Sequence, residues 1–258
     1  MQCWHLSGAG NDFMVIDARG KEMDFAQMAV KLCKLTGADG FMAVQESQIA
    51  DFRLHFYNSD GSRGEMCGNG SRCICRFAHD LGVAGEKMTV QTDAGIVEGQ
   101  RISEENYLVK LNNPSVLDLQ RKGDIAYVEL GDPGVPHGVQ ELKKLSWAMG
   151  EMLREHAVAL RYDPVFPKGA NVNFYTKLDD TTVRILTYER GVEDYTLACG
   201  TGSASVAVAL WAKGQLPGGK LTVLNRGGTL SVRIGEKDGA IESLWLEGPT
   251  EIVKIMEV

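Results

Sequence analysis

The chain contains an internal repeat that spans about half of its length. MCGNGSRCICRFAHDLG (66–82) aligns without a gap with ACGTGSASVAVALWAKG (198–214), so that a cysteine, two glycines, a serine and a closing glycine coincide 132 residues apart. KMTVQTDAG (87–95) and KLTVLNRGG (220–228) match at a separation of 133, and FRLHFYN (52–58) resembles VRILTYE (183–189) at 131. A repeat of this size indicates duplication of a whole domain. It predicts two similar lobes related by a pseudo-twofold axis.

Local patterns predict the same kind of lobe twice. Apolar residues from Ile74 to Leu81 recur at helical spacing, and Gly82 is placed to end that helix, whereas 203–213 is apolar nearly all round and predicts a buried helix. Short β-rich stretches bounded by turn residues lie at 13–17, 52–57, 88–92, 183–188, 221–224 and 244–246. The predicted fold class is α+β, with a strongly curved sheet wrapped around one central helix in each lobe.

The repeat also sets the expected domain organisation. Residues 1–115 form the predicted N-terminal lobe and residues 116–247 the C-terminal lobe, with the boundary in the segment 113–119. The last residues, 248–258, are expected to return and complete the sheet of the first lobe.

Composition narrows the class of protein. In 258 residues, 44% are hydrophobic and 24% charged, which is ordinary for a folded soluble protein, and the net charge of −7 argues against binding to nucleic acid or an anionic membrane. The N-terminal residues lack the pattern of a signal peptide, and the small, apolar segment 198–212 is too short to span a bilayer. We therefore expect a cytoplasmic protein whose partner is a small molecule.

The six cysteines do not suggest a disulfide framework or a metal centre. In a reducing compartment an even count carries little weight, and the spacing of Cys67, Cys73 and Cys75 is not that of a usual zinc site. No metal is predicted. Cys3, Cys33, Cys73 and Cys75 are interpreted as structural.

Cys67 and Cys199 occupy a special position, because each directly precedes a glycine-rich helix start. The positive end of the helix dipole and the unpaired backbone N–H groups there should lower the pKa of a thiol and favour the thiolate. The glycines leave the amides open, so either helix start could hold a carboxylate.

Such a pair suits one reaction especially well. If the pseudo-twofold axis brings the two helix starts face to face, a carboxylate can bind both while its neighbouring carbon lies between two sulfurs. One thiolate could then remove the α-proton from one side, and one thiol could return a proton to the other. The amides would stabilise the charge that develops on the carboxylate. No phosphate-binding lysine or dinucleotide motif is present, so no cofactor is predicted.

The motifs resemble those of the diaminopimelate epimerase family. Its members are cofactor-independent, two-thiol amino-acid epimerases of bacterial lysine and cell-wall biosynthesis. The resemblance rests on four segments in the family's order: SGAGNDFMVID, FYNSDGSRGEMCGNGSRC, GANVNF and YERGVEDYTLACGTGSAS. It implies that Cys67 and Cys199 are the catalytic cysteines. It also implies that the α-carboxylate is held by the backbone amides of Gly68, Asn69, Gly200 and Thr201.

The resemblance assigns further roles to polar residues. Asn11 is expected near the reacting end of the substrate, Glu189 near its amino group, and His137 beside one of the thiols. The distal end of the substrate would be bound by Asn58, Asn171 and Arg190, where the arginine can hold a carboxylate in bidentate fashion. A homodimer is left open.

Two departures and two alternatives accompany this interpretation. Val135 and Gly40 stand where many or some family members have Asn and Gln, and both positions concern substrate recognition more than proton transfer. The first alternative is a racemase of another amino acid, such as histidine, on the same fold. The second is a noncatalytic binding or thiol redox protein, although the C-x-x-C motif typical of the latter is absent.

Overall fold

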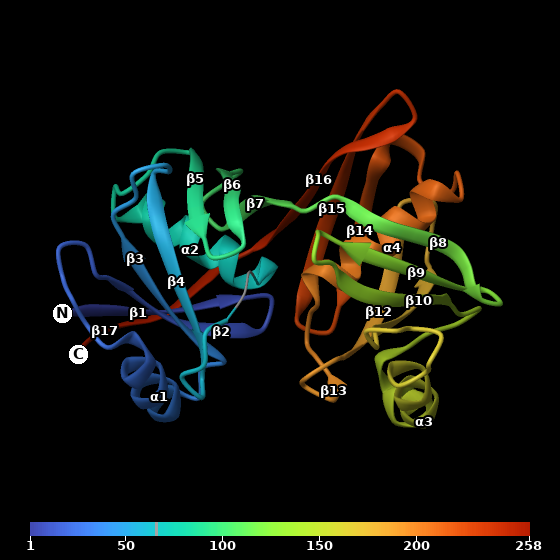
Figure 1. Ribbon diagram of the computed structural model, residues 1–258, viewed down its shortest axis with the longest axis horizontal. Coiled ribbons are helices and arrows are strands. Elements are labelled where there is room, and N and C mark those ends of the chain that lie inside the picture. The colour runs from blue at the N-terminus through green and yellow to red at the C-terminus, as the bar shows by residue number, and fades with distance from the viewer. Residues whose placement is uncertain (65–66) are drawn as a thin grey trace. The chain divides into compact units, whose positions relative to one another are not determined.

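The structure is a computed structural model that describes residues 1–64 and 67–258 (Figure 1). Glu65 and Met66, which open the EMCGNGSRC motif, lie outside the described residues. The chain divides into two compact units: Met1–Lys110 with Glu247–Val258, and Leu111–Leu246. The sequence placed the corresponding boundary a few residues later, at 115.

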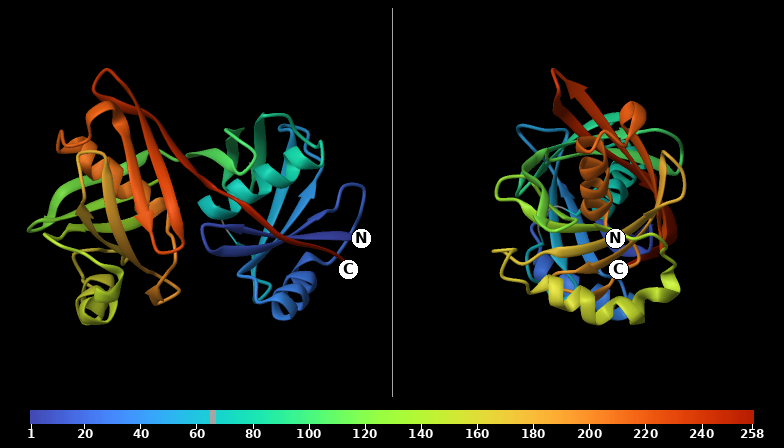
Figure 2. Two further views of the ribbon diagram at one scale, coloured as in Figure 1. Left: turned by 180° about the vertical axis from the view of Figure 1, so that it is seen from behind. Right: turned by 90° about the vertical axis from the view of Figure 1, so that its right-hand side faces the viewer.

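The first unit consists of a sheet, a central helix and an outer helix. Its strands are β1 (Gln2–Gly8), β2 (Asn11–Asp17), β3 (Gly40–Gln45), β4 (Phe52–Asn58), β5 (Lys87–Thr92), β6 (Gly95–Arg101), β7 (Asn106–Leu111) and β17 (Glu251–Glu257). Its helices are α1 (Phe25–Thr36) and α2 (Gly68–Asp80). The C-terminal strand β17 runs back through this unit and pairs antiparallel with β1, so both termini lie side by side (Figure 2).

The second unit repeats this plan. Its strands are β8 (Pro114–Lys122), β9 (Ile125–Leu130), β10 (Val135–Glu141), β11 (Asn171–Lys177), β12 (Thr182–Glu189), β13 (Asp194–Tyr195), β14 (Lys220–Asn225), β15 (Gly228–Lys237) and β16 (Ala240–Pro249). Its helices are α3 (Gly150–Arg161) and α4 (Gly200–Ala212), with short 3-10 turns at Trp147–Met149 and Pro217–Gly219. The strand β16 continues past the end of this unit into the first one.

Strand pairing shows the duplication directly. In the first unit the order β17-β1-β2-β3-β4-β5-β6 is antiparallel, antiparallel, parallel, antiparallel, parallel and antiparallel. In the second unit β8-β9-β10-β11-β12-β14-β15 has the same succession of directions. In both, one helix connects the second parallel pair of strands and is enclosed by the sheet. The predicted α+β fold class is confirmed.

The central helices are buried because the sheets surround them. In α2, the residues from Gly68 to Ala78 are buried, and α4 is buried from Gly202 to Leu210. Close approach to the strands depends on glycine: a Cβ added to Gly8 on β1 would lie 2.9 Å from the backbone oxygen of Asn69 and from Cys73 Sγ. Gly82 has a φ of +67° and follows the end of α2, as the sequence predicted.

The outer helices cover a second apolar layer in each unit. In α1, Phe25, Ala29 and Leu32 pack against Met14 and Phe41 of the neighbouring strands. In α3, Ala157 and Leu160 pack in the same way against apolar residues of β11 and β12. Asp24 caps α1 by accepting a hydrogen bond from the backbone N–H of Gln27 at 3.0 Å. These layers hold the strands that carry the polar residues described below.

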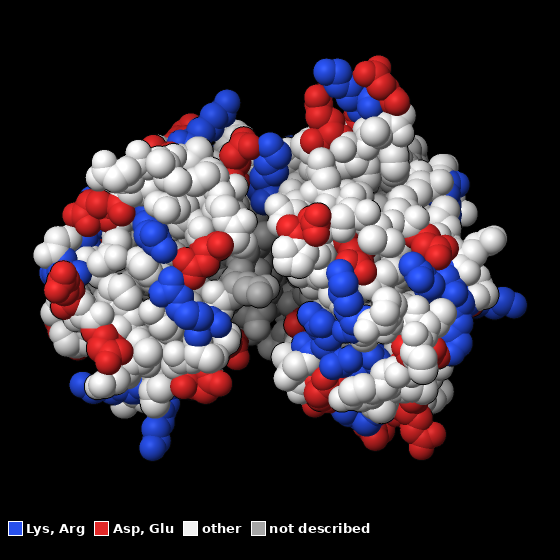
Figure 3. Space-filling model, in the orientation of Figure 1, with Lys and Arg blue, Asp and Glu red and all other residues white. Residues whose placement is uncertain are grey.

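Charged side chains of both signs are interspersed over the described part of the face shown in Figure 3. Among the helices of the described residues, none is both long and apolar enough to cross a membrane.

Candidate active site

Cys67 directly precedes α2 and has extended backbone angles, while its carbonyl oxygen accepts the first helical hydrogen bond from the N–H of Ser71 at 2.7 Å. The N–H groups that follow it in the first turn have no acceptor within a helix. Of the six cysteines, all within the described residues, only Cys67 is part-exposed. Burial raises the pKa of Cys3 to about 11 and that of Cys73 to about 12, which fits their structural role.

A line of side-chain amides holds the first turn of α2. The side-chain nitrogen of Asn69 donates to Asn11 Oδ1 at 2.5 Å, and Asn11 Nδ2 donates to Asp39 Oδ2 at 3.3 Å. Asp39 also accepts the backbone N–H of Asp12 at 2.9 Å. The structure therefore brings Asn11 and Asn69 together at the helix start that follows Cys67, and Asp39 orients Asn11. Their roles toward a substrate stay predictions.

Arg72 lies beneath this turn and was not singled out from the sequence. Its side chain is fully buried and donates to the carbonyl oxygen of Gly68 at 3.1 Å and to Asn69 Oδ1 at 3.0 Å. Burial lowers the pKa of its guanidinium, and the neighbouring Cys73 and Cys67 thiols act in the opposite direction. Because arginine stays protonated in proteins, a buried positive charge lies close to Cys67. The GNGSRC motif contained this residue, but helix periodicity alone did not distinguish it.

Asn58 ends β4 and starts the loop that leads toward Cys67. The side-chain nitrogen of Asn58 donates to Ser62 Oγ at 2.9 Å. The backbone N–H of the following residue, Ser59, donates to the backbone carbonyl oxygen of Asp39 at 3.2 Å. Asn58 thus lies at the same sheet edge as Asn11, through their shared neighbour Asp39.

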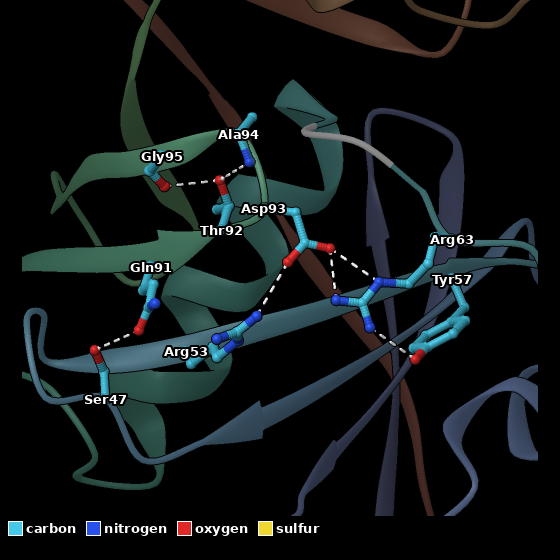
Figure 4. Close-up of polar contacts among 9 residues, drawn as sticks. All are labelled: Ser47, Arg53, Tyr57, Arg63, Gln91, Thr92, Asp93, Ala94 and Gly95. Carbon is cyan, nitrogen blue, oxygen red and sulfur yellow. Dashed lines mark hydrogen bonds and ion pairs between the residues drawn. The ribbon is translucent and has the colours of Figure 1, made fainter.

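The loop after Asn58 is fastened by a charged cluster on β4 and the β5–β6 turn. Asp93 lies between two arginines, accepting from Arg53 at 3.2 Å and from Arg63 at 2.6 Å, while Arg63 also donates to the hydroxyl of Tyr57 at 2.9 Å (Figure 4). These side chains are about 36–46% exposed, so each ion pair contributes little to stability. Their effect is to fix the path of the chain between Asn58 and Gly64.

In the second unit Cys199 directly precedes α4. Its sulfur accepts the N–H of Gly202 at 3.3 Å and lies 3.5 Å from Thr201 Oγ1, and its carbonyl oxygen accepts from the N–H of Ser203 at 2.9 Å. Helix starts therefore follow both Cys67 and Cys199 at equivalent points of the repeat. Gly200 and Thr201 form the first turn here, as Gly68 and Asn69 do in α2.

The expected low pKa of Cys199 is wrong for this structure. Burial raises the pKa of its thiol well above the usual value, and the neighbouring Glu189 carboxyl raises it further. Hydrogen bonds from Thr201 and Gly202 lower it by less. Desolvation penalises the thiolate more than the helix start favours it, so Cys199 is protonated at neutral pH. The expectation for Cys67 stays a prediction.

Glu189 ends β12 and faces Cys199. Burial raises the pKa of its carboxyl, while hydrogen bonds with Thr196 and Cys199 oppose that shift. Its Oε1 accepts from Thr196 Oγ1 at 2.6 Å. Cys199 and Glu189 therefore form a neighbouring acid pair within one unit. The expected place of Glu189 near the substrate's amino group stays a prediction.

His137 lies on β10 with no exposed surface. Its Nδ1 is 3.1 Å from Asn173 Nδ2, and its Nε2 has no hydrogen-bond partner among the described residues. Burial, followed by the charge of Arg190, lowers the pKa of His137 to about 3. The imidazole is therefore uncharged over the physiological range.

Asn171 and Arg190 adjoin each other on β11 and just after β12. Asn171 Oδ1 accepts the backbone N–H of Arg190 at 2.8 Å, and Arg190 Nη1 donates to the carbonyl oxygen of Lys168 at 3.0 Å. The Nζ atom of Lys168 in turn contacts Glu129 Oε2 at 2.6 Å. Asn171 and Arg190, which were predicted to bind the distal end of the substrate, are thus neighbours, and Arg190 is exposed.

The described residues contain no cluster of His, Cys, Asp or Glu side chains with the geometry of a metal site.

Comparison with known proteins decides which family these features belong to. The profile of the diaminopimelate epimerase family matches residues 3–116 and 132–253. The diaminopimelate epimerase of Aquifex aeolicus is 35% identical over 251 residues, with 88% of each chain covered. That of Flavobacterium psychrophilum is 33% identical over 259 residues, with 98% of each chain covered.

The chain belongs to the diaminopimelate epimerase family. Solved structures resemble this family member in fold alone. A phenazine biosynthesis protein of the PhzF family from Bacillus anthracis has a TM-score of 0.73 at 15% identity, covering 100% of this chain and 98% of its own. A hydroxyproline epimerase from Agrobacterium vitis has a TM-score of 0.68 at 16% identity, covering 100% and 90%.

Proposed function

We propose that the protein interconverts LL-2,6-diaminopimelate and meso-diaminopimelate without a cofactor, using Cys67 and Cys199 as proton acceptor and donor. It is an isomerase by family. The observation that carries the mechanism is the repeated local structure: in each unit a cysteine precedes the glycine-containing first turn of a buried helix. Amides of such a turn bind an anion, and a carboxylate is the group that makes an adjacent C–H acidic.

The protonation state of Cys199 assigns the starting roles. Because its pKa is raised by burial and by Glu189, Cys199 enters as the thiol. The thiolate of Cys67 would take the α-proton, and the C–H electron pair would pass into the carboxylate. Cys199 would then give its proton to the other side of the carbon and become the thiolate. After the product leaves, Cys67 loses its proton to solvent and Cys199 takes one from solvent, which restores the starting state, and the reverse reaction starts with the two roles exchanged.

Three features support the first step on Cys67. Cys67 is the part-exposed cysteine, Arg72 places a buried positive charge near it, and the first-turn amides of α2 follow it. Positive charge and N–H dipoles stabilise a thiolate. Asn11 and Asn69, linked at 2.5 Å, would present polar groups to the substrate's reacting end.

The distal end of diaminopimelate carries a second amino acid group. Arg190, adjoining Asn171, would bind its carboxylate through two N–H groups, with Asn58 contributing a polar contact. A substrate without a distal carboxylate would leave this guanidinium without its anion. This argument favours diaminopimelate over an amino acid such as histidine.

The test is α-proton exchange followed by proton NMR. Fully reduced protein in heavy water is incubated with LL-diaminopimelate and, in parallel, with other L-amino acids, including histidine. We expect loss of the α-proton signal and formation of the meso isomer with diaminopimelate alone. Exchange with a different amino acid alone would move the assignment to the racemase alternative, and exchange with none would leave the redox or binding alternative.

A further inference from the structure

The side-chain environment of His137 determines which of its ring nitrogens carries the proton. Asn173, on the neighbouring strand β11, has no exposed surface. Its Nδ2 lies 3.1 Å from His137 Nδ1, 3.0 Å from the carbonyl oxygen of Gly138 and 3.4 Å from that of Asn171. A carbonyl oxygen can only accept a hydrogen bond. The Asn173 atom facing it must therefore be the amide nitrogen, which fixes the orientation of the amide group.

This orientation leaves one neutral form of the imidazole. An amide nitrogen cannot accept a hydrogen bond, so His137 Nδ1 faces it as the acceptor and carries no hydrogen. A neutral imidazole then has its hydrogen on Nε2. His137 Nε2 is buried and has no hydrogen-bond partner among the described residues, so its N–H is a donor that an acceptor of a bound ligand could satisfy.

Thr187 on β12 completes the arrangement from the other side of Asn173. Its hydroxyl donates to Asn173 Oδ1 at 3.0 Å, and Thr187 is itself buried. The first turn of α4 closes the remaining space, because a Cβ added to Gly202 would collide with Asn173 Oδ1. The donor and acceptor ends of the Asn173 amide are therefore each engaged by a fixed partner.

We propose that Asn173, oriented by Thr187, is a positioning residue that holds His137 in the tautomer with hydrogen on Nε2, so that His137 serves as a hydrogen-bond donor to an anion and not as a base. The role of that donor in turnover rests on the proposed epimerase function, whereas the tautomer itself does not. The low pKa of His137, set by burial and by the charge of Arg190, agrees with an uncharged donor.

The experiment reads the tautomer directly. The full-length protein is labelled with 15N in histidine, and long-range nitrogen–proton correlations are recorded at neutral pH, with His137→Gln used to assign the His137 signals. We expect a protonated Nε2 and an unprotonated Nδ1. A hydrogen on Nδ1, or on both nitrogens, would overturn the proposal whatever the activity of the protein.

Asn173→Leu provides the decisive variant, because leucine has almost the same shape and can neither donate nor accept a hydrogen bond. His137 should then lose its single tautomer, with hydrogen appearing on Nδ1, and kcat with diaminopimelate should fall at least about 10-fold, since the donor on Nε2 is no longer fixed. KM should change much less. An Asn173→Leu protein that keeps the original pattern, or that loses it with kcat unaltered, contradicts the proposal.

Thr187 supplies a milder pair of variants in case Asn173→Leu prevents folding. Thr187→Ser keeps the hydroxyl and should keep both the wild-type His137 pattern and kcat. Thr187→Val, which is nearly the same shape, removes the donor to Asn173 and should broaden or shift the His137 signals and lower kcat. Equal kcat and identical spectra for the serine and valine variants would refute the part assigned to Thr187.

Discussion

The Cys199 thiol and the Glu189 carboxyl lie against each other at the start of α4, and each is shifted toward its protonated form. Burial is the main cause for both, and the charge that Glu189 could carry raises the pKa of Cys199 further. A cysteine at a helix start is therefore not necessarily a thiolate. In this protein, Cys199, which we propose as one of the two reacting thiols, is held in its protonated form.

Replacing Glu189 tests that relationship. In Glu189→Gln the carboxylate charge is gone, so the pKa of Cys199 should fall and its alkylation by iodoacetamide at mildly alkaline pH should speed up several-fold. The rate is measured by mass spectrometry of the Cys199 peptide. Buried Cys75 serves as the internal reference, because burial raises its pKa to about 12. An unchanged or slower alkylation rate at Cys199 would show that Glu189 does not raise the pKa of the Cys199 thiol.

Acid stability should report the burial of His137. The pKa of His137 is about 3 in the folded protein and near the ordinary value of 6.5 in the unfolded chain. Between these two pH values the unfolded chain binds a proton that the folded chain does not. The contribution of His137 to the free energy of unfolding is complete above pH 6.5, and it is lost as the pH falls toward the folded-state pKa of about 3. From about pH 7.5 to pH 5, the loss is about 2 kcal/mol of unfolding free energy.

Urea unfolding of wild type and His137→Gln at both pH values measures this contribution. The wild-type protein should lose about 2 kcal/mol more than the variant over the interval. Equal losses would mean that His137 is accessible to protons in the folded state.

The repeat offers a matched pair of glycine substitutions. In Gly202→Ala the new methyl group would collide with Asn173 Oδ1 and lie 3.2 Å from Cys199 Sγ. We expect a loss of about 1–3 kcal/mol in stability and a large fall in kcat. Gly70 occupies the equivalent position in α2, where a Cβ would lie 3.4 Å from Phe13, an ordinary contact. Gly70→Ala should leave stability unchanged or slightly raised in urea unfolding, and equal effects at both positions would contradict this account.

Arg190→Lys tests the distal contact. Lysine keeps the charge but loses the paired N–H groups that match a carboxylate, so KM for diaminopimelate should rise about 10- to 100-fold with a smaller change in kcat. The control is Lys168→Gln, since the Lys168 side chain pairs with Glu129 while only its backbone oxygen contacts Arg190. Steady-state kinetics should show a much smaller KM change for the control. Similar KM values for both variants would remove Arg190 from substrate binding.

Much of the fold could be predicted because the sequence contains the same pattern of motifs in both halves. The repeated Cys-Gly-x-Gly-Ser segments located α2 and α4, and the apolar stretches at 52–57 and 183–188 lie within β4 and β12. The helices α1 and α3 were not predicted, although Asp24 is a good N-cap residue, because each buries only one face and lies outside the repeated motifs.

The site was harder to predict in its details. Motifs identified Asn171, but Asn173, two residues further in the same GANVNF segment, owes its role to a contact across strands that no local pattern reveals. Likewise, the pKa of Cys199 depends on how completely α4 and Glu189 exclude water, which helix-dipole reasoning does not include. Tertiary burial decided both points.

The most direct test of the central claim is to follow solvent deuterium incorporation with Cys67→Ala and Cys199→Ala, starting separately from LL- and meso-diaminopimelate. Two thiols with complementary roles predict that both variants lose epimerisation in both directions, while the wild-type protein forms the product isomer with deuterium at the inverted centre. Either variant retaining near wild-type epimerisation would contradict the two-thiol mechanism.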